Sequence, residues 1–283
     1  MPHPAAFRLQ RLTAGARALA VLAGLLALAP AAFAQSAPGP SCPFEVPASA
    51  PPFTLPRAVD AIGAGAPLRI LAIGSSSTAG FGASGSGQAY PAQLAGRLNA
   101  ALAPRAVTVT NGGVSGETGP TTLRRLEAAM AAPEPPQIVI WQVGTNDVLF
   151  GGTPAGLEAL VVRGLDAVAA AGGVPIVVDQ QYFRGILNLA HYEAFVAAVH
   201  RAAASRGAAL LGRYAVMKHW AHAAPGAFET IMALDRFHMG DRGYACLADL
   251  LATGILAKPP AASPQMPQAA PAPGRPPAGA ATR

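Results

Sequence analysis

Three consecutive serines, Ser75 to Ser77, follow a short apolar run that stops at Gly74. A serine hydroxyl becomes a nucleophile when a nearby base removes its proton, and histidine suits this task because its unperturbed pKa is about 6.5. Asp235 and His238 lie three residues apart and could supply that base and a carboxylate to orient it. Together these residue types indicate nucleophilic catalysis by a serine.

Two further polar stretches carry groups that could stabilise a developing negative charge. The stretch NGGVSGETG covers residues 111–119 and GTND covers residues 144–147, and each follows an apolar run. Ligands of parallel sheets bind at the carboxyl ends of the strands, so both stretches are expected beside the serines. Backbone N–H groups and side-chain amides there could donate hydrogen bonds to an oxyanion.

The elements that position these stretches alternate between strand-like and helix-like patterns. Short runs that are apolar on both faces, separated by helices, indicate a parallel sheet covered by helices on both sides. The sequence therefore predicts an α/β fold, a three-layer α/β/α sandwich with a five-stranded parallel sheet. The expected strands are residues 68–73, 107–111, 137–143, 174–179 and 208–214, and the expected helices are residues 90–102, 120–132, 153–171, 190–206 and 240–256.

In their order and spacing, the four polar stretches resemble those of the SGNH (GDSL-like) hydrolase family, which is named for its Ser, Gly, Asn and His. The resemblance covers about residues 68–250. It implies a flavodoxin-like sandwich, and ester hydrolysis through a serine acyl-enzyme with no cofactor. The residues alone leave all three serines open. The family's Gly-Asp-Ser-Leu aligns with Gly74 to Ser77, which implies Ser76 as the nucleophile, Ser75 in place of the usual Asp and Ser77 in place of the usual Leu.

The resemblance also implies roles for the other site residues. His238 would be the base and Asp235 its partner, which completes a Ser-His-Asp triad. The backbone N–H groups of Ser76 and Gly116 and the side-chain amide of Asn146 would form the oxyanion hole. With Ser75 at this position the triad is still complete, but the Asp that supports the loop in the family is absent.

Composition divides the chain into four parts. Residues 1–34 combine a basic start, an apolar run and an AFA cleavage site, which predicts a signal peptide and an exported, periplasmic or secreted protein. The apolar run, residues 18–29, is shorter than the roughly 20 residues of a spanning helix, so no membrane span is expected after removal of the signal. A Pro/Ala-rich arm (35–65) and tail (258–283), both expected to be mobile, flank a hydrolase domain over residues 66–257.

The charge distribution argues against a nucleic-acid partner. The chain has 20 Lys and Arg against 14 Asp and Glu, a formal net charge of +6. The excess lies in the predicted signal and in the tail, so residues 35–257 are neutral overall. The expected domain therefore lacks the electrostatic footprint of nucleic-acid binding.

Other motifs in the sequence have simpler interpretations. GFGASG, residues 80–85, satisfies the dinucleotide pattern but does not open a helix, which favours a flexible loop beside the active site. No Gly-Lys-Ser/Thr follows Gly74, which excludes a P-loop, and His219 and His222 lack a third ligand for a metal. Cys42 and Cys246 could form a disulfide in an oxidising compartment or remain unpaired.

Several residues near the expected strand ends are candidates for supporting roles. Gln142 is polar within an apolar strand and could brace the active-site loops; Asp147 could cap a loop or contact the serine stretch, and Asp179 could be a turn or cap residue. An acyl pocket could be lined by Val148, Leu149, Phe150, Tyr182, Phe183, Ile186 and Leu187, with Arg184 among them.

The sequence thus predicts an exported serine esterase for short to medium acyl chains. The alternatives are a polysaccharide O-acetyl esterase and a catalytically weak SGNH-like domain that binds glycan or cell envelope. The expected partner is an ester-bearing small molecule or an acylated glycan or lipid, and the oligomeric state is left open.

Overall fold

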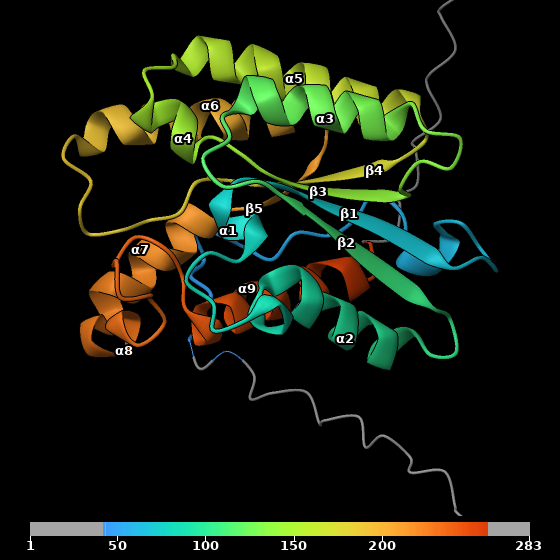
Figure 1. Ribbon diagram of the computed structural model, residues 1–283, viewed down its shortest axis with the longest axis horizontal. Coiled ribbons are helices and arrows are strands. Elements are labelled where there is room, and N and C mark those ends of the chain that lie inside the picture. The colour runs from blue at the N-terminus through green and yellow to red at the C-terminus, as the bar shows by residue number, and fades with distance from the viewer. Residues whose placement is uncertain (1–41, 43, 260–283) are drawn as a thin grey trace, which may run out of the picture. The chain divides into compact units, whose positions relative to one another are not determined.

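The computed structural model describes residues 42 and 44–259, and a five-stranded sheet forms its centre (Figure 1). All neighbouring strands run parallel, in the order β2-β1-β3-β4-β5. The fold class and sheet predicted from the sequence are confirmed. The strands are β1 (Leu68–Gly74), β2 (Val107–Gly113), β3 (Ile138–Gln142), β4 (Val174–Val178) and β5 (Ala209–Leu211).

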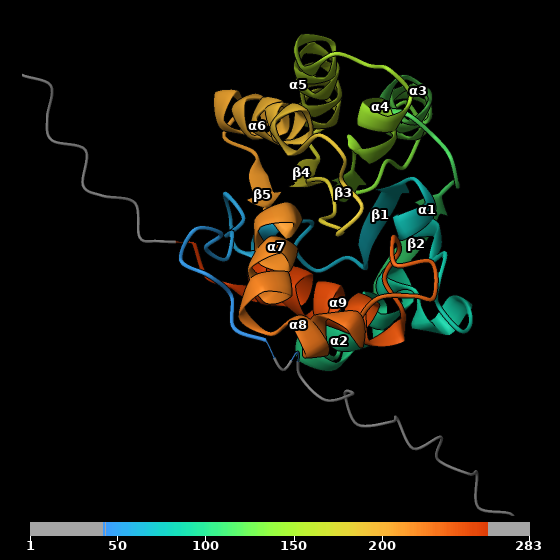
Figure 2. The same cartoon turned by 90° about the vertical axis from the view of Figure 1, so that its left-hand side faces the viewer.

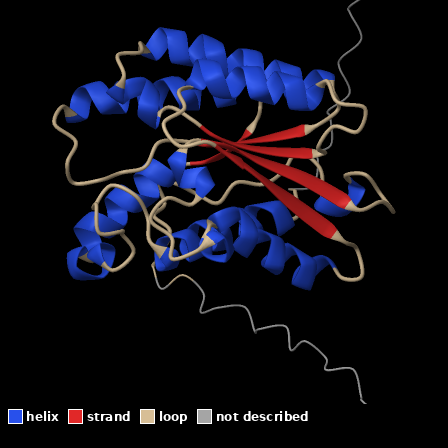
Figure 3. Ribbon diagram, in the orientation of Figure 1, coloured by secondary structure: helices blue, strands red, loops and turns tan. Residues whose placement is uncertain are grey.

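Helices cover both faces of the sheet, which gives the three layers seen in Figures 2 and 3. One face packs against α3 (Gly119–Met130), α5 (Pro154–Ala170) and α6 (Leu189–Ser205). The other face packs against α2 (Tyr90–Leu102), α7 (Arg213–Ala223), α8 (Pro225–Glu229) and α9 (Asp241–Leu256). The remaining short elements are α1 (Ser76–Ala79), α4 (Thr145–Leu149), η1 (Val59–Ala61) and η2 (Ser86–Gln88).

The central strand β3 shows why the sheet is apolar on both faces. Ile138 and Ile140 join the core beneath α2 and α9, whereas Val139 and Trp141 join the core beneath α3, α5 and α6. Trp141 lies tightly on Gly164 of α5, where a Cβ would come within 2.2 Å of the ring. Trp141 therefore packs the core.

The expected strand over residues 208–214 is partly wrong, because β5 ends at Leu211 and α7 begins at Arg213. The carboxylate of Asp179 accepts a hydrogen bond from the N–H of Tyr214 at 2.8 Å and so caps the first turn of α7. Asp179 is thus a cap residue. The short helices α1, α4 and α8 were not predicted, since four or five residues are too few to show a helical period.

The structure also corrects the expectation for the N-terminal arm. Residues 44–58 form no helix or strand, yet Phe53 is buried and packs onto Gly254 of α9, where a Cβ would lie 2.4 Å from its ring. Phe44 stacks on Trp220 of α7, whose indole N–H donates to the carbonyl oxygen of Glu45 at 2.9 Å. The expectation of a mobile arm is therefore wrong for these residues.

A disulfide joins Cys42 to Cys246, which answers the question that the sequence left open. It ties the arm to α9 across a sequence separation of 204 residues. The predicted signal peptide and nearly all of the predicted tail lie outside the described residues. Among the described residues, no helix has the length and apolar character needed to cross a membrane.

Candidate active site

The serine stretch lies where β1 ends and the short helix α1 begins with Ser76. Gly74 is needed at this junction because a Cβ there would lie 2.6 Å from the hydroxyl of Thr78 and 2.7 Å from the carbonyl oxygen of Gln142. This close packing lies at the carboxyl end of β1, and it is Ser76 whose hydroxyl reaches His238 there.

A continuous chain of hydrogen bonds joins Ser76, His238 and Asp235. The Oγ of Ser76 lies 2.7 Å from Nε2 of His238, and Nδ1 of the same ring lies 2.6 Å from Oδ2 of Asp235. With the ring proton on Nδ1, His238 donates to Asp235 and can accept the serine proton at Nε2. Of the three residues expected to form a triad, Ser76 and Asp235 thus each lie within hydrogen-bonding distance of His238.

The loop that carries His238 is shaped by Asp235. Its Oδ1 accepts the backbone N–H groups of Phe237 at 3.0 Å and of His238 at 2.9 Å. Arg236, between them, has a φ of 54°, in the left-handed region that few non-glycine residues adopt. Such backbone strain is concentrated at functional sites, and here it lets one carboxylate hold both the ring and the backbone of the loop.

Two effects act on the carboxyl group of Asp235. Burial alone would raise its pKa, but the hydrogen bonds from the ring and backbone of His238 and from the N–H of Phe237 outweigh it. The net pKa of Asp235 lies below its ordinary value, which keeps the group ionised beside the imidazole.

The other two serines point to different partners. Ser75 donates its N–H and its hydroxyl to Oε1 of Gln142, at 3.1 and 3.2 Å. The hydroxyl of Ser77 donates to Oε1 of Gln181 at 2.7 Å. Of the three serine hydroxyls, it is that of Ser76 that contacts the histidine.

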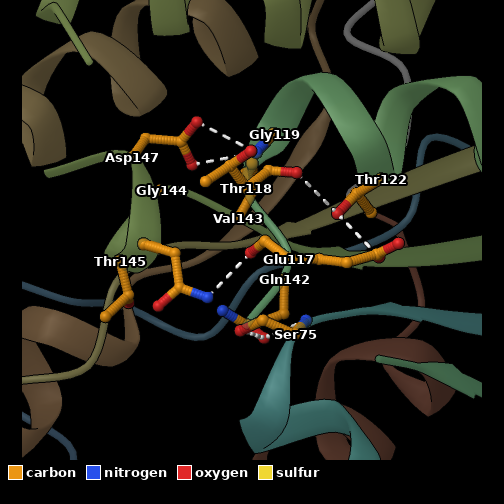
Figure 4. A pocket seen from close by; sticks show the side chains of 11 residues that line it. Ser75, Glu117, Thr118, Gly119, Thr122, Gln142, Val143, Gly144, Thr145 and Asp147 are labelled. Carbon is orange, nitrogen blue, oxygen red and sulfur yellow. Dashed lines mark hydrogen bonds between the residues drawn. The ribbon is translucent and has the colours of Figure 1, made fainter. Parts of the chain in front are cut away.

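A narrow polar pocket, shown in Figure 4, is lined by Ser75, the end of β3, the start of α4 and the loop before α3. Both carboxylate oxygens of Asp147 accept the N–H of Gly119, at 2.9 and 3.1 Å, so Asp147 caps the start of α3. Burial raises the pKa of Asp147 above its ordinary value despite these bonds. Gln142 therefore braces the serine stretch, and Asp147 braces the stretch at residues 111–119.

Of the two other residues expected in the oxyanion hole, Asn146 lies in α4 and Gly116 lies in the loop between β2 and α3. The amide nitrogen of Asn146 donates to the carbonyl oxygen of Glu117 at 2.7 Å, which uses one of its two hydrogens. Gly116 has a φ of 82° and no atom within 4 Å of where its Cβ would be, so its backbone is open to a ligand. The N–H of Val114 donates to the carbonyl oxygen of Gly74 at 3.0 Å, which holds this loop against the end of β1.

Sequence reasoning missed the aromatic surroundings of His238. Phe81 and Phe237 flank the imidazole, with ring centroids 4.5 and 4.6 Å from its own. Phe81 belongs to the GFGASG loop, where Gly82 has a φ of 89° and a Cβ would lie 2.6 Å from the carbonyl oxygen of Met239. The loop lies beside the site as expected, but it is closely packed and not the flexible loop that the sequence indicated. The two glycines around Phe81 were the signal that could have indicated this close approach.

An apolar pocket of about 450 Å³ adjoins the histidine loop through Phe237. Five of the expected residues line it, namely Val148, Leu149, Phe183, Ile186 and Leu187, together with Tyr192 and His191 of α6. The expectation is wrong for Tyr182, which packs against Tyr214 and Phe228, and Phe150 is not part of the lining either. Arg184 pairs instead with Glu229 at 2.9 Å.

The fold recurs in solved structures of low sequence identity. A lipase/acylhydrolase from Enterococcus faecalis is 22% identical, with a TM-score of 0.57 over 67% of this chain and 95% of that chain. A mutant of an acetyl-xylooligosaccharide esterase from a Geobacillus species is 20% identical, with a TM-score of 0.57 over 68% and 95%. The esterase EstA from Pseudoalteromonas sp., inhibited by monoethylphosphonate, is 20% identical, with a TM-score of 0.55 over 66% and 96%.

These likenesses show a shared fold, and no curated protein matches the sequence. The family assignment comes from a family model, that of the non-GDSL lipase-like family, which matches residues 41–259. The match covers the sheet, both helix layers and every site residue described above. The chain therefore belongs to the non-GDSL lipase-like family.

Proposed function

We propose that the protein is a serine esterase that hydrolyses carboxylic esters of short to medium acyl chains through an acyl-enzyme on Ser76. The observation that carries this proposal is the hydrogen-bonded chain from Ser76 through His238 to Asp235. A domain that only binds glycan or envelope would need no aligned nucleophile, base and carboxylate, so this geometry favours catalysis over the binding alternative.

In the proposed acylation step, the Oγ of Ser76 attacks the ester carbonyl carbon while its proton passes to Nε2 of His238. Asp235 stabilises the imidazolium that forms. The negative oxygen of the tetrahedral intermediate receives hydrogen bonds from the N–H groups of Ser76 and Gly116 and from the amide of Asn146. The intermediate then collapses, and the leaving alcohol takes the proton from His238.

In the deacylation step, His238 removes a proton from water, which attacks the acyl-enzyme carbonyl. The second tetrahedral intermediate uses the same donors, and its collapse returns the proton to Ser76 and releases the carboxylic acid. The acyl chain lies in the apolar pocket next to Phe237. Because each buried methylene contributes about 0.8 kcal/mol, kcat/KM should rise about fourfold per added methylene until the pocket is full.

We also propose that the protein acts outside the cytoplasm, in the periplasm or the medium. The disulfide between Cys42 and Cys246 supports this location, since disulfides persist in oxidising compartments.

The test combines a panel of p-nitrophenyl esters from acetyl to palmitoyl with active-site labelling. The wild-type protein should turn over acetyl to medium-chain esters, and a fluorophosphonate should form an adduct that peptide mapping places on Ser76. Ser76→Ala should lower kcat by about 10⁴-fold or more and abolish the adduct, whereas Ser75→Ala should still be labelled. Equal turnover in the wild type and in folded Ser76→Ala would refute the proposal. Turnover confined to acetyl esters, with acetate released from acetylated glycans, would favour the polysaccharide O-acetyl esterase.

A further inference from the structure

A hydrogen-bonded bridge links the helix that carries the proposed nucleophile to the loop that carries the proposed base. The hydroxyl of Ser77 donates to Oε1 of Gln181 at 2.7 Å, and Nε2 of Gln181 donates to the carbonyl oxygen of Phe237 at 3.1 Å. Ser77 and Gln181 are each only 2% exposed. We call this Ser77–Gln181–Phe237 arrangement the Gln181 bridge.

The bridge joins the chain neighbours of the two reacting residues. Ser77 directly follows Ser76, and Phe237 directly precedes His238, so the two ends of the bridge lie one residue from each partner of the Ser76–His238 hydrogen bond. These segments are 162 residues apart in the sequence and are held by different elements. A spacer between them therefore acts directly on the distance from the serine oxygen to the imidazole.

Gln181 is itself held firmly enough to serve as a spacer. It follows β4, and its carbonyl oxygen accepts the hydroxyl of Tyr192 at 2.8 Å. The side chains of Ser77 and Gln181 are buried, and only the Phe237 end of the bridge is partly exposed, so both hydrogen bonds are largely shielded from bulk water. Such hydrogen bonds rigidify a site when they are satisfied. Ser77 and Gln181 form a matched polar pair, and Ser77 stands where the resembled family has an apolar Leu.

We propose that Ser77 and Gln181 are positioning residues that set the alignment of Ser76 with His238 for proton transfer. The inference rests on the proposed esterase function and adds two residues to its machinery that touch neither substrate nor the reacting atoms. A displacement of about 1 Å can cost up to about 100-fold in rate, so the loss of this rigid spacer should be visible in kcat.

The test uses Ser77→Ala, Gln181→Met and the double variant. Each single change should lower kcat and the rate of phosphonylation of Ser76 about tenfold, within the limit set by misalignment, with KM changed less than about twofold. The double variant should resemble the more impaired single variant, because the same bridge is broken once in each case. Ser77→Ala removes one oxygen atom, so it remains informative even if Gln181→Met fails to fold.

A second comparison separates positioning from a general loss of structure. In a His238→Ala background, Ser77→Ala should cause no further fall in the residual kcat, because the bridge acts through His238. The control is Asn99→Ala, since Asn99 also joins two elements by its amide, to the carbonyl oxygen and N–H of Val107 at 2.7 and 2.9 Å, at the opposite end of the sheet. Asn99→Ala should lower Tm and leave kcat unchanged.

The outcomes distinguish this inference from the proposed function. Wild-type kcat in folded Ser77→Ala, with turnover that still depends on Ser76, would overturn the bridge and leave the esterase proposal standing. A fall in kcat on Ser77→Ala that is as large in the His238→Ala background as in the wild type would also overturn it. The effect of the change would then not depend on the base. Turnover that does not depend on Ser76 would refute the proposed function and the bridge with it.

Discussion

Gln142 supports Ser75 from the neighbouring strand, accepting the serine N–H at 3.1 Å and the serine hydroxyl at 3.2 Å on a single side-chain oxygen. The same oxygen lies 3.3 Å from the hydroxyl of Thr78. Ser75 stands where the resembled family has an Asp that supports the loop. In this chain β3 holds the loop at Ser75 through Gln142, which accepts both of the serine's donors.

Gln142→Leu should therefore impair both stability and rate. The change removes the acceptor of three buried donors, and an unsatisfied buried donor costs about 1–3 kcal/mol. We expect a loss of at least that size in the free energy of unfolding, measured by urea denaturation, and a fall in kcat larger than any rise in KM. Ser75→Ala is the matched control: it removes one of the three donors and should have a much smaller effect. Equal effects of the two changes would contradict the bracing role.

Asn146→Ala should lower turnover with little effect on substrate binding. Removal of one oxyanion-hole donor typically lowers kcat by about 10²- to 10³-fold. Steady-state kinetics with a p-nitrophenyl ester would show this as a fall in kcat at nearly constant KM. The amide of Asn146 also donates to the carbonyl oxygen of Glu117, so Tm should be measured alongside, and a kcat close to that of the wild type in the folded variant would exclude Asn146 from the oxyanion hole.

Asp235→Asn should lower kcat by about 10⁴-fold, because the amide favours the wrong tautomer of His238.

A pH effect on stability follows from the lowered pKa of Asp235. The folded carboxyl group loses its proton more readily than the unfolded one, so its contribution to stability is present above the unfolded value of about 3.9. It is lost as the pH falls through the lower folded value.

The contribution of the lowered pKa of Asp235 to the free energy of unfolding should be small, since its side chain is 36% exposed and solvent screens the interaction. Urea denaturation at neutral pH and at acid pH, for the wild type and Asp235→Asn, measures it. The difference in unfolding free energy should shrink toward acid pH. A difference that grew toward acid pH would contradict the direction of the shift.

Reduction of the disulfide should destabilise the protein by about 2–4 kcal/mol, the usual range for a bridge that closes a long loop. Cys42 and Cys246 close a loop with a separation of 204 residues and hold the arm whose Phe53 is buried against α9. The measurement is urea denaturation of the wild type with and without reductant. The variant Cys42→Ala/Cys246→Ala is the control, because reductant should leave its midpoint unchanged.

Ile186→Trp should shorten the preferred acyl chain. Ile186 lines the apolar pocket and is partly buried, so an indole there would fill space that a medium acyl chain needs. We expect kcat/KM for octanoyl esters to fall at least about tenfold, roughly the contribution of two buried methylenes, while acetyl esters are turned over as before. A parallel fall for both esters would show that the change disturbs the triad rather than the pocket.

The sequence by itself determined the fold class and the set of candidate residues, because both depend on local patterns. Buried parallel strands read as continuous apolar runs, and polar residues at their ends stand out against them. The expected helix at residues 90–102 has the bounds of α2. The resemblance to a known family, which the family model bears out, then selected Ser76 among three serines of identical chemistry.

Only the tertiary structure decided how these residues meet. Adjacent serines differ in direction once α1 forms, and this sends Ser75 to Gln142, Ser76 to His238 and Ser77 to Gln181. Those partners are 67, 162 and 104 residues away in the sequence. The same holds for the arm, whose Pro/Ala-rich composition indicated mobility although Phe53 and Leu55 are buried. Contacts of this kind depend on packing between distant segments, which no local pattern of residues encodes.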